Sequence, residues 1–179
     1  MTARKLWHFH GGLKLLGHKP VSMQQAVEKT PIPPQLIIPL QQHIGAPAEA
    51  VVNVGDKVKK GQVIAEMQAT VSAPVHAPTS GTISAIEERA VPHPSCMAAS
   101  CIIIDTDGKD EWIDDRKGHS QFHLLDPDEL RSIIRNAGIV GLGGAGFPSY
   151  LKLQPGQGKI VDTLILNGAE CEPWITCDA

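Results

Sequence analysis

Aromatic side chains are scarce in this sequence of 179 residues, at 4 %, and it has no long run of apolar residues. A membrane-spanning helix needs about 18 or more consecutive apolar residues, which no stretch supplies. The first twelve residues, MTARKLWHFHGG, also lack the apolar segment of a secretory signal. We therefore expect a chain that neither spans a membrane nor is exported.

Cysteine is sparse as well, with only Cys96, Cys101, Cys171 and Cys177. Their spacings, C-x4-C and C-x5-C, match neither the usual zinc-binding pairs nor the bacterial ferredoxin run. His93 lies near the first pair, which leaves a metal site open as an alternative. Thiols in a chain without an export signal more often serve as small buried hydrophobes, so we predict no metal ligands and no disulfide.

The sequence also lacks a strongly basic segment, and its formal net charge is −3. Residues 1–60 carry eight Lys/Arg and three Asp/Glu, a net charge of +5, whereas residues 61–179 carry eight and sixteen, a net charge of −8. This division suits contact with other proteins. Nucleic-acid binding normally requires a clustered basic face, so we expect no nucleic-acid partner.

Turn-forming residues are abundant, with 17 Gly and 14 Pro, while the apolar content of 42 % is ordinary for a globular protein. We predict an irregular N-terminal extension over 1–40, because closely spaced prolines at 31, 33 and 34 exclude a helix. An all-β domain follows over 41–105, then a polar linker over 106–125. Residues 126–179 read as the beginning of an α/β domain, so the predicted fold class is mixed α+β.

Short apolar runs separated by turn signals predict the β domain. The runs are 51–54, 63–65, 75–77, 82–86 and 101–104, and the turns contain Gly55, Gly61 and Gly81. The run Cys101–Ile104 is rich in β-branched residues and predicts a buried strand. Strands this short and evenly spaced indicate a small sandwich or barrel.

A helix is predicted to begin after residue 126. Asp126 is an N-cap candidate, Pro127 suits the first helical position, and Glu129 completes a capping box. Leu130, Ile133, Ile134 and Ala137 then form one apolar face, and Gly138 is the expected end. A second, short helix is expected from Pro148 to Leu153, and a buried strand over 163–166.

The segment between these helices, G-L-G-G-A-G-F-P over 141–148, has the composition of a phosphate-binding loop. Four glycines in six positions allow the backbone to approach an anion closely. We expect the helix beginning at Pro148 to add partial positive charge, and Lys152 to add a cation. The loop follows a helix rather than a strand, so it is not a standard Rossmann fingerprint. A glycine-rich connector without a ligand remains the alternative.

A polar segment follows the last predicted strand, N-G-A-E-C-E-P over 167–173. Ligands of open α/β sheets bind beyond the carboxyl ends of strands. Asn167 offers both a donor and an acceptor to a heterocycle, and Glu170 and Glu172 could accept from ribose hydroxyls. A solvated loop is the alternative interpretation.

Two stretches, V-N-V-G-D-K-V-K-K-G-Q-V-I-A-E and A-P-T-S-G-T-I, resemble the lipoyl/biotinyl barrel-sandwich hybrid. In that family a hairpin between the two halves presents one lysine for the cofactor. Here the residues between Glu66 and Pro78 contain no lysine. The resemblance therefore implies the fold without the swinging-arm function.

The order of the motifs H-F-H-G-G, V-x-A-P-V-H-A-P-T-S-G, G-L-G-G-A-G-F-P and N-G-A-E-C-E-P-W-I-T-C-D is similar to that of the RnfC components of Rnf electron-transport complexes. These proteins are related to the flavin- and NADH-binding subunit of respiratory complex I. The resemblance implies that an FMN phosphate and ribityl chain lie on the glycine loop, at Gly141, Gly143, Gly144 and Gly146. It also implies that Lys152 and Asn167 contact the flavin, that Phe147 stacks on the NADH adenine, and that Glu170 and Glu172 face the nicotinamide.

The same resemblance implies a redox-enzyme subunit in which NADH reduces FMN and the flavin passes electrons to [4Fe-4S] clusters. No side chain of this chain then has to act as a general acid or base. The implied partners are the other Rnf subunits, NAD(H) and, indirectly, ferredoxin or flavodoxin. The implied location is peripheral, on the cytoplasmic face of the bacterial inner membrane.

The paired cluster motifs C-x2-C-x2-C-x3-C-P of that family do not occur in these residues. We therefore expect the sequence to correspond to the N-terminal part of such a protein, with weak or no FMN affinity and no electron transfer by itself. The alternative function is a lipoyl-like docking or assembly module without its own cofactor. A cofactor-carrying arm is disfavoured because the hairpin lacks lysine.

Overall fold

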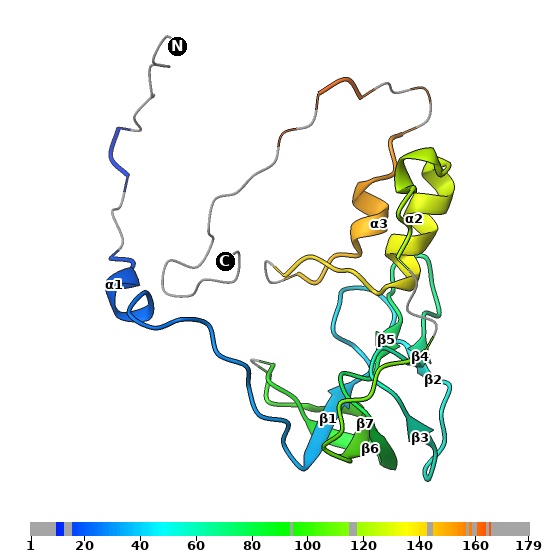
Figure 1. Ribbon diagram of the computed structural model, residues 1–179. Helices are drawn as coiled ribbons and strands as arrows, with labels where there is room; N and C mark the ends of the chain where they lie inside the picture. The colour runs from blue at the N-terminus through cyan, green and yellow to red at the C-terminus, as the bar shows by residue number, and fades with distance from the viewer. Residues whose placement is uncertain are drawn as a thin grey trace. The chain divides into compact units, whose positions relative to one another are not determined.

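The computed structural model describes residues 10–12, 16–93, 95–114, 118–142, 145–156, 158, 161–163 and 165 (Figure 1). The chain divides into two compact units, one of Met1–Lys29 with Leu164–Ala179 and the other of Thr30–Thr163. In the first unit, α1 (Lys19–Ser22) is a single helical turn with a proline at its start. The second unit holds every other helix and strand of the described residues.

Two antiparallel sheets form the body of this second unit. A four-stranded sheet has the order β1-β7-β6-β3, and a three-stranded sheet has the order β2-β4-β5. The strands of the first are β1 (Gln35–Pro39), β7 (Ala98–Thr106), β6 (Gly81–Ala90) and β3 (Lys57–Val58). Those of the second are β2 (Glu49–Ala50), β4 (Val63–Glu66) and β5 (Val75–His76). The predicted all-β segment is confirmed, although β6 and β7 are longer than the apolar runs that predicted them.

The core lies between these sheets and consists mainly of aliphatic side chains. Ile64, Ile83, Ile102 and Ile104 are fully buried in it. Burial of such a side chain contributes roughly 1.5–3 kcal/mol, so these few residues supply much of the stability of the unit. The predicted buried run Cys101–Ile104 is confirmed, since all four of its residues are buried.

Strand β1 was not expected, because its segment falls within the proline-rich N-terminal extension. It pairs with β7 from Gln35↔Asp105 to Pro39↔Cys101, and Leu36 and Ile38 pack against the core. It is an edge strand of its sheet, where a proline is tolerated because one side of the strand needs no hydrogen-bond donor. The prolines therefore mark an edge rather than the absence of a strand.

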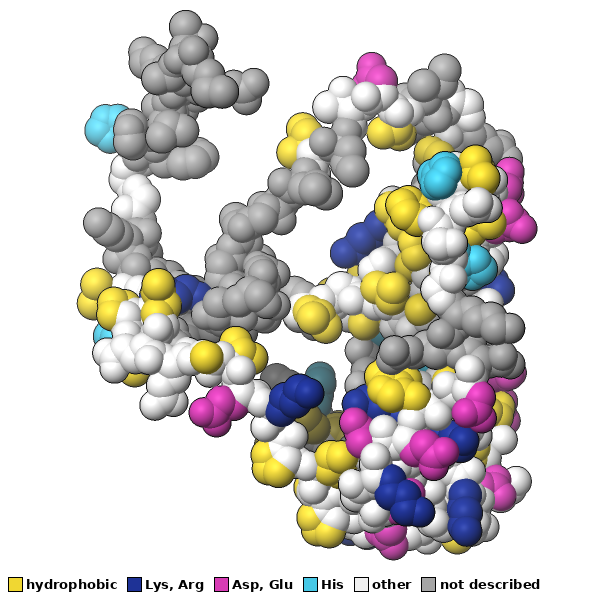
Figure 2. Space-filling model, in the orientation of Figure 1, with side chains coloured by type: hydrophobic (Ala, Val, Ile, Leu, Met, Phe, Trp, Pro, Cys, Tyr) yellow, Lys and Arg dark blue, Asp and Glu magenta, His cyan; other side chains and the backbone are white. Residues whose placement is uncertain are grey.

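Residues 107–113, placed in the predicted linker, bind to the barrel. Asp107 accepts hydrogen bonds from the Ser80 hydroxyl and the Lys109 amide, at 2.7 and 2.9 Å. These bonds, the one from the Lys109 amide first, lower the pKa of Asp107. Lys60 forms an ion pair with Asp110 at 2.7 Å. In Figure 2, Lys and Arg side chains alternate with Asp and Glu over this part of the molecule.

The predicted first helix is confirmed. Helix α2 (Pro127–Asn136) has Asp126 as its N-cap, and its capping box with Glu129 is complete. It ends before Gly138, whose φ is +67°. A single 3-10 turn, η1 (Phe122–Leu124), precedes it.

Two predictions differ from the structure. Thr163 and Ile165, the described residues of the expected buried strand, belong to no strand, and Ile165 is 86 % exposed. A strand requires a hydrogen-bonding neighbour, and none pairs with these two residues in the described part of the chain. Cys96 was expected to be buried but is exposed, in a turn where its φ is +54°, whereas Cys101 is buried as predicted.

Candidate functional site

The glycine loop is closed at its base like a hairpin. Val140 and Pro148 form an antiparallel bridge. The Gly141 amide donates to the Phe147 carbonyl at 2.8 Å, and the Ser149 amide donates to the Ile139 carbonyl at 2.9 Å. These bonds hold the two ends of the loop together and leave the residues between them to project from the base. Leu142 is strongly exposed, and Ala145 is exposed as well.

One cation lies over this base. The Nζ of Lys152 is 5.8 Å from the centroid of the Phe147 ring. It is also so close to Gly141 that a Cβ at this position would lie 3.0 Å from the ammonium. Residues 139–152 contain no Asp or Glu, and Lys152 is their only charged residue. An anion at this loop would therefore meet a positive charge and no carboxylate of the same segment.

The short helix after the loop contributes less than the sequence predicted. Helix α3 (Ser149–Lys152) has four residues, a single turn, and Pro148 is its N-cap. The dipole of a helix depends on many aligned peptide units, so one turn adds little positive charge. The positive charge of the site comes from the Lys152 side chain, which the helix directs back toward the loop.

The structure brings together four of the nine predicted cofactor-binding residues: Gly141, Gly146, Phe147 and Lys152. The other five lie outside the described residues: Gly143, Gly144, Asn167, Glu170 and Glu172. The relation of the glycine loop to the acidic segment therefore stays a prediction.

The far end of the loop rests on a turn of the barrel. Gly146 has a φ of +56°, and a Cβ at this position would lie 2.8 Å from both the Gln42 carbonyl oxygen and the His43 Cα. Only glycine allows this approach without displacing the turn. We call residues 41–46 the support turn.

The support turn is held by His43, which the sequence analysis did not identify. The His43 side chain is buried, and its Nδ1 lies 3.0 Å from the Ile44 carbonyl oxygen. Its Nε2 accepts a hydrogen bond from the Ala73 amide at 3.2 Å. These two contacts fix one tautomer, with the proton on Nδ1 and the lone pair on Nε2. No pattern around His43 in the sequence could have revealed this, because its partner lies thirty positions away.

Residues 67–74, between β4 and β5, are the segment that carries the lysine in lipoyl-like domains. We call them the hairpin tip. The Val71 carbonyl accepts from the Ala46 amide at 3.0 Å, and the Thr70 carbonyl accepts from the Tyr150 hydroxyl. Ser72 is fully buried, and its hydroxyl has no hydrogen-bond partner among the described residues. A tip covered in this way cannot act as a mobile arm.

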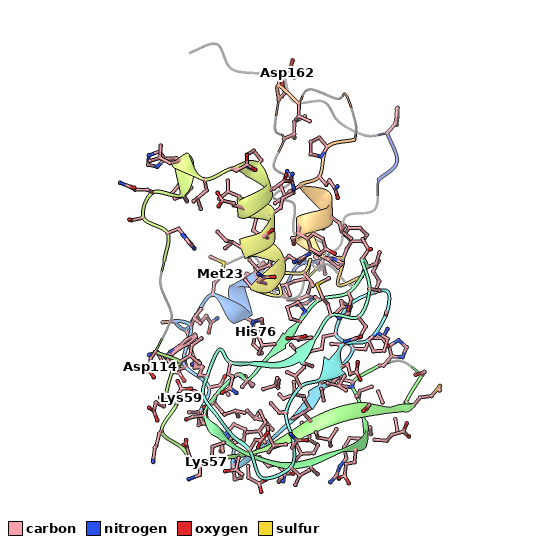
Figure 3. All side chains as sticks on the ribbon, turned by 90° about the vertical axis from the view of Figure 1, so that its right-hand side faces the viewer. Met23, Lys57, Lys59, His76, Asp114 and Asp162 are labelled. Atoms are coloured by element: carbon pink, nitrogen blue, oxygen red, sulfur yellow. The ribbon has the colours of Figure 1, made fainter. Side chains whose placement is uncertain are left out.

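Beyond the hairpin tip, β5 also contacts the end of α2. A Cβ on Gly138 would lie 3.3 Å from two atoms of the His76 ring and 2.7 Å from the Pro74 carbonyl oxygen. Figure 3 shows His76 beside the end of α2. Burial lowers the pKa of His76, and a hydrogen bond with the Asn136 backbone opposes this shift.

A groove of about 790 Å³ runs beside the glycine loop, with Ala145 and Gly146 at one wall. The other walls come from β1, the support turn and the connection between β6 and β7, and no residue lining the groove is Lys, Arg, Asp or Glu. The groove therefore offers no counter-charge to a phosphate, whereas the base of the loop offers Lys152.

Comparison with known families agrees with this geometry. The sequence profile of the RnfC barrel sandwich hybrid domain matches residues 7–109. The chain belongs to the RnfC family. The profile of the Nuo51 FMN-binding domain matches residues 134–179, which include the glycine loop. The predicted barrel-sandwich fold and the relation to the complex I flavin subunit are thereby confirmed.

Curated relatives are named as the RnfC-type component of an ion-translocating oxidoreductase complex. The chain is 46 % identical over 174 residues to such a protein of Vibrio cholerae, a match that covers 97 % of the chain and 22 % of the relative. Relatives from Salmonella gallinarum and Salmonella dublin are also 46 % identical, with 25 % and 24 % of their lengths covered. The chain thus spans about a quarter of the length of these RnfC proteins. Among the described residues, no helix is long and apolar enough to cross a membrane.

Proposed function

We propose that the glycine loop of this RnfC chain holds the phosphate and ribityl chain of FMN. Gly141, Gly143, Gly144 and Gly146 would provide the backbone surface, and Lys152 the counter-charge. One observation carries the proposal: a closed loop with a single cation and no carboxylate lies within the segment that matches an FMN-binding domain. Such a loop fits a phosphate, because it combines backbone donors with an unopposed positive charge.

The remaining predicted residues would bind the rings. Asn167 would contact the flavin, Phe147 the adenine of NADH, and Glu170 and Glu172 the nicotinamide side. Two departures from the complex I pattern concern these contacts. The arginine of that glycine loop is replaced by Leu142 or Gly143 here, and the aspartate after the asparagine by Ala169. Bound FMN would supply hydride acceptance and single-electron transfer, while these residues only bind and orient.

For the whole protein we propose electron transfer within an ion-translocating oxidoreductase, consistent with the name of the curated relatives. NADH would be the reductant, and [4Fe-4S] clusters outside residues 1–179 would receive the electrons. Its partners would be the other Rnf subunits and, through them, ferredoxin or flavodoxin. It would be bound peripherally at the cytoplasmic face of the inner membrane.

Comparison of FMN with riboflavin tests the proposal, because the two differ only in the phosphate. In the natural protein that contains residues 1–179, Lys152→Gln should raise the Kd for FMN about tenfold, as expected for a lost charge-assisted contact. The Kd for riboflavin should change little. Lys57→Gln is the matched control, since Lys57 is an exposed lysine on the distant strand β3 (Figure 3).

Failure of the unmodified protein to bind FMN at all would contradict the proposal. Continued assembly with its partners in that case would favour the alternative of a docking module without a cofactor. Equal loss of FMN and riboflavin affinity in Lys152→Gln would show that the lysine does not serve the phosphate.

A further inference from the structure

We propose that the hairpin tip of the barrel, acting through His43, is a rigid seat that sets the position of the FMN-binding loop. His43 is then a positioning residue for FMN although it does not touch the cofactor. The inference rests on the proposed function, because it assigns a role to the barrel at that same site. It gives the segment that would carry a lysine in lipoyl-like domains a different use.

The first step of the argument is the contact between the hairpin tip and the support turn. The Ala46 amide donates to the Val71 carbonyl at 3.0 Å, and the Ala73 amide donates to His43 Nε2 at 3.2 Å. Gly45 has a φ of +91°, and a Cβ there would lie only 2.1 Å from the Val71 carbonyl oxygen. The two backbones are therefore in direct contact, with two hydrogen bonds between them.

The second step is the contact between the support turn and the glycine loop. Gly146 packs against the backbone of Gln42 and His43, within a distance that excludes any side chain. A displacement of His43 thus displaces the surface on which the loop rests. His43 therefore links the hairpin tip on one side to the loop on the other.

The third step is that the elements on both sides of the loop also rest on this part of the barrel. The Tyr150 hydroxyl of α3, after the loop, donates to the Thr70 carbonyl. At the end of α2, before the loop, Gly138 packs against Pro74 and His76. The loop is thus supported before, within and after its glycine run by residues 70–76.

A seat of this kind has a physical purpose. Four glycines give the free loop many backbone conformations, and a ligand that selects one of them loses affinity through the entropy of ordering. Supporting the loop on a packed barrel reduces that loss before the cofactor arrives. The advantage should be greatest for the part of the ligand that the loop contacts, which is the phosphate.

The chemistry of His43 provides a matched pair of variants. His43→Leu removes the acceptor and leaves the Ala73 amide without its partner, which is costly for a buried group. His43→Gln keeps an acceptor oxygen on a side chain of similar reach. His119→Leu is the control for loss of a histidine, since His119 is exposed in the segment before η1.

The experiment measures the Kd for FMN and for riboflavin in the natural protein that contains this chain. His43→Leu should raise the Kd for FMN on the order of tenfold and change that for riboflavin much less. His43→Gln and His119→Leu should keep the wild-type values within about a factor of two. A merely structural role would weaken both ligands equally, and the glutamine would restore neither.

Tyr150→Phe decides the question if His43→Leu does not fold, because it removes one hydroxyl from the second contact. It should raise the Kd for FMN about threefold without a comparable change for riboflavin. Wild-type protein that does not prefer FMN over riboflavin would contradict the proposed function itself. Wild-type preference that persists in folded His43→Leu, or in Tyr150→Phe when the leucine variant does not fold, would overturn only the positioning role.

Discussion

At the scale of single residues, two glycines separate backbone strain from packing. Gly146 and Gly108 both have left-handed backbones, with φ of +56° and +71°. A Cβ on Gly108 would meet nothing within 4 Å, whereas on Gly146 it would meet the backbone of the support turn at 2.8 Å. The two positions therefore share the conformational cost of alanine but not the steric cost.

We predict that Gly108→Ala lowers the free energy of unfolding by about 1 kcal/mol, the cost of a left-handed alanine. Gly146→Ala should lower it by at least about 1 kcal/mol more, because the support turn must move. Urea-induced unfolding followed by circular dichroism measures both values. Equal losses in the two variants would mean that the loop does not rest on the support turn.

Residue-scale features were only partly visible in the sequence. The density of glycine and the position of Lys152 identified the loop and its cation, because both depend on neighbours within twelve positions. His43 was invisible, since its partner Ala73 and its contact Gly146 are distant in sequence and ordinary in type. A histidine whose two nitrogens are both satisfied by backbone groups leaves no local signature.

At the scale of elements, the contact between β5 and α2 depends on a neutral histidine. His76 lies against Gly138, and burial lowers its pKa below the ordinary value of about 6.5. The unfolded chain therefore takes up a proton more readily than the folded one. Stability is fully present above a pH of about 6.5 and is lost as the pH falls through the folded-state pKa.

We predict that His76→Gln removes part of this acid sensitivity. The difference in unfolding free energy between pH 7.5 and pH 5 should be smaller in the variant than in the wild-type chain. His119→Gln, which changes an exposed histidine, should keep the wild-type dependence. An unchanged pH profile in His76→Gln would show that this histidine does not charge more easily on unfolding.

Elements with local start and stop signals were predicted accurately. The capping box of α2 and the glycine after it are sequence-local, so the helix has the expected bounds within one residue. Strand β1 and the docking of residues 107–113 were not predicted, because both depend on hydrogen bonds to distant segments. The expected strand at 163–166 failed for the same reason, since an apolar run predicts a strand only where a partner pairs with it.

At the scale of the whole molecule, the barrel and the start of the flavin-binding segment share one compact unit, Thr30–Thr163. The hairpin tip is buried between them instead of projecting into solvent. Thr70, Val71 and Ala73 each form a hydrogen bond with a residue outside the hairpin. The packing thus disfavours a carrier function independently of the missing lysine.

We predict that the Ala46 and Ala73 amides exchange with deuterium on the same time scale as the core amides of β7. Both amides donate to partners across the contact between the hairpin tip and the support turn, so exchange requires that contact to open. Mass spectrometry of peptic peptides would measure the rates. Exchange within seconds at 70–74 while β7 stays protected would show a mobile tip and contradict this arrangement.

The sequence by itself determined the barrel-sandwich class, the capped helix α2, the glycine loop and its lysine, because each follows from patterns within a few neighbouring residues. Only the tertiary structure decided what the hairpin tip does. Its use as a seat depends on backbone groups of residues 42–46 and 70–73 that meet across the fold and carry no side-chain pattern. Local chemistry is written in residue types, whereas contacts between distant backbones exist only once the chain has folded.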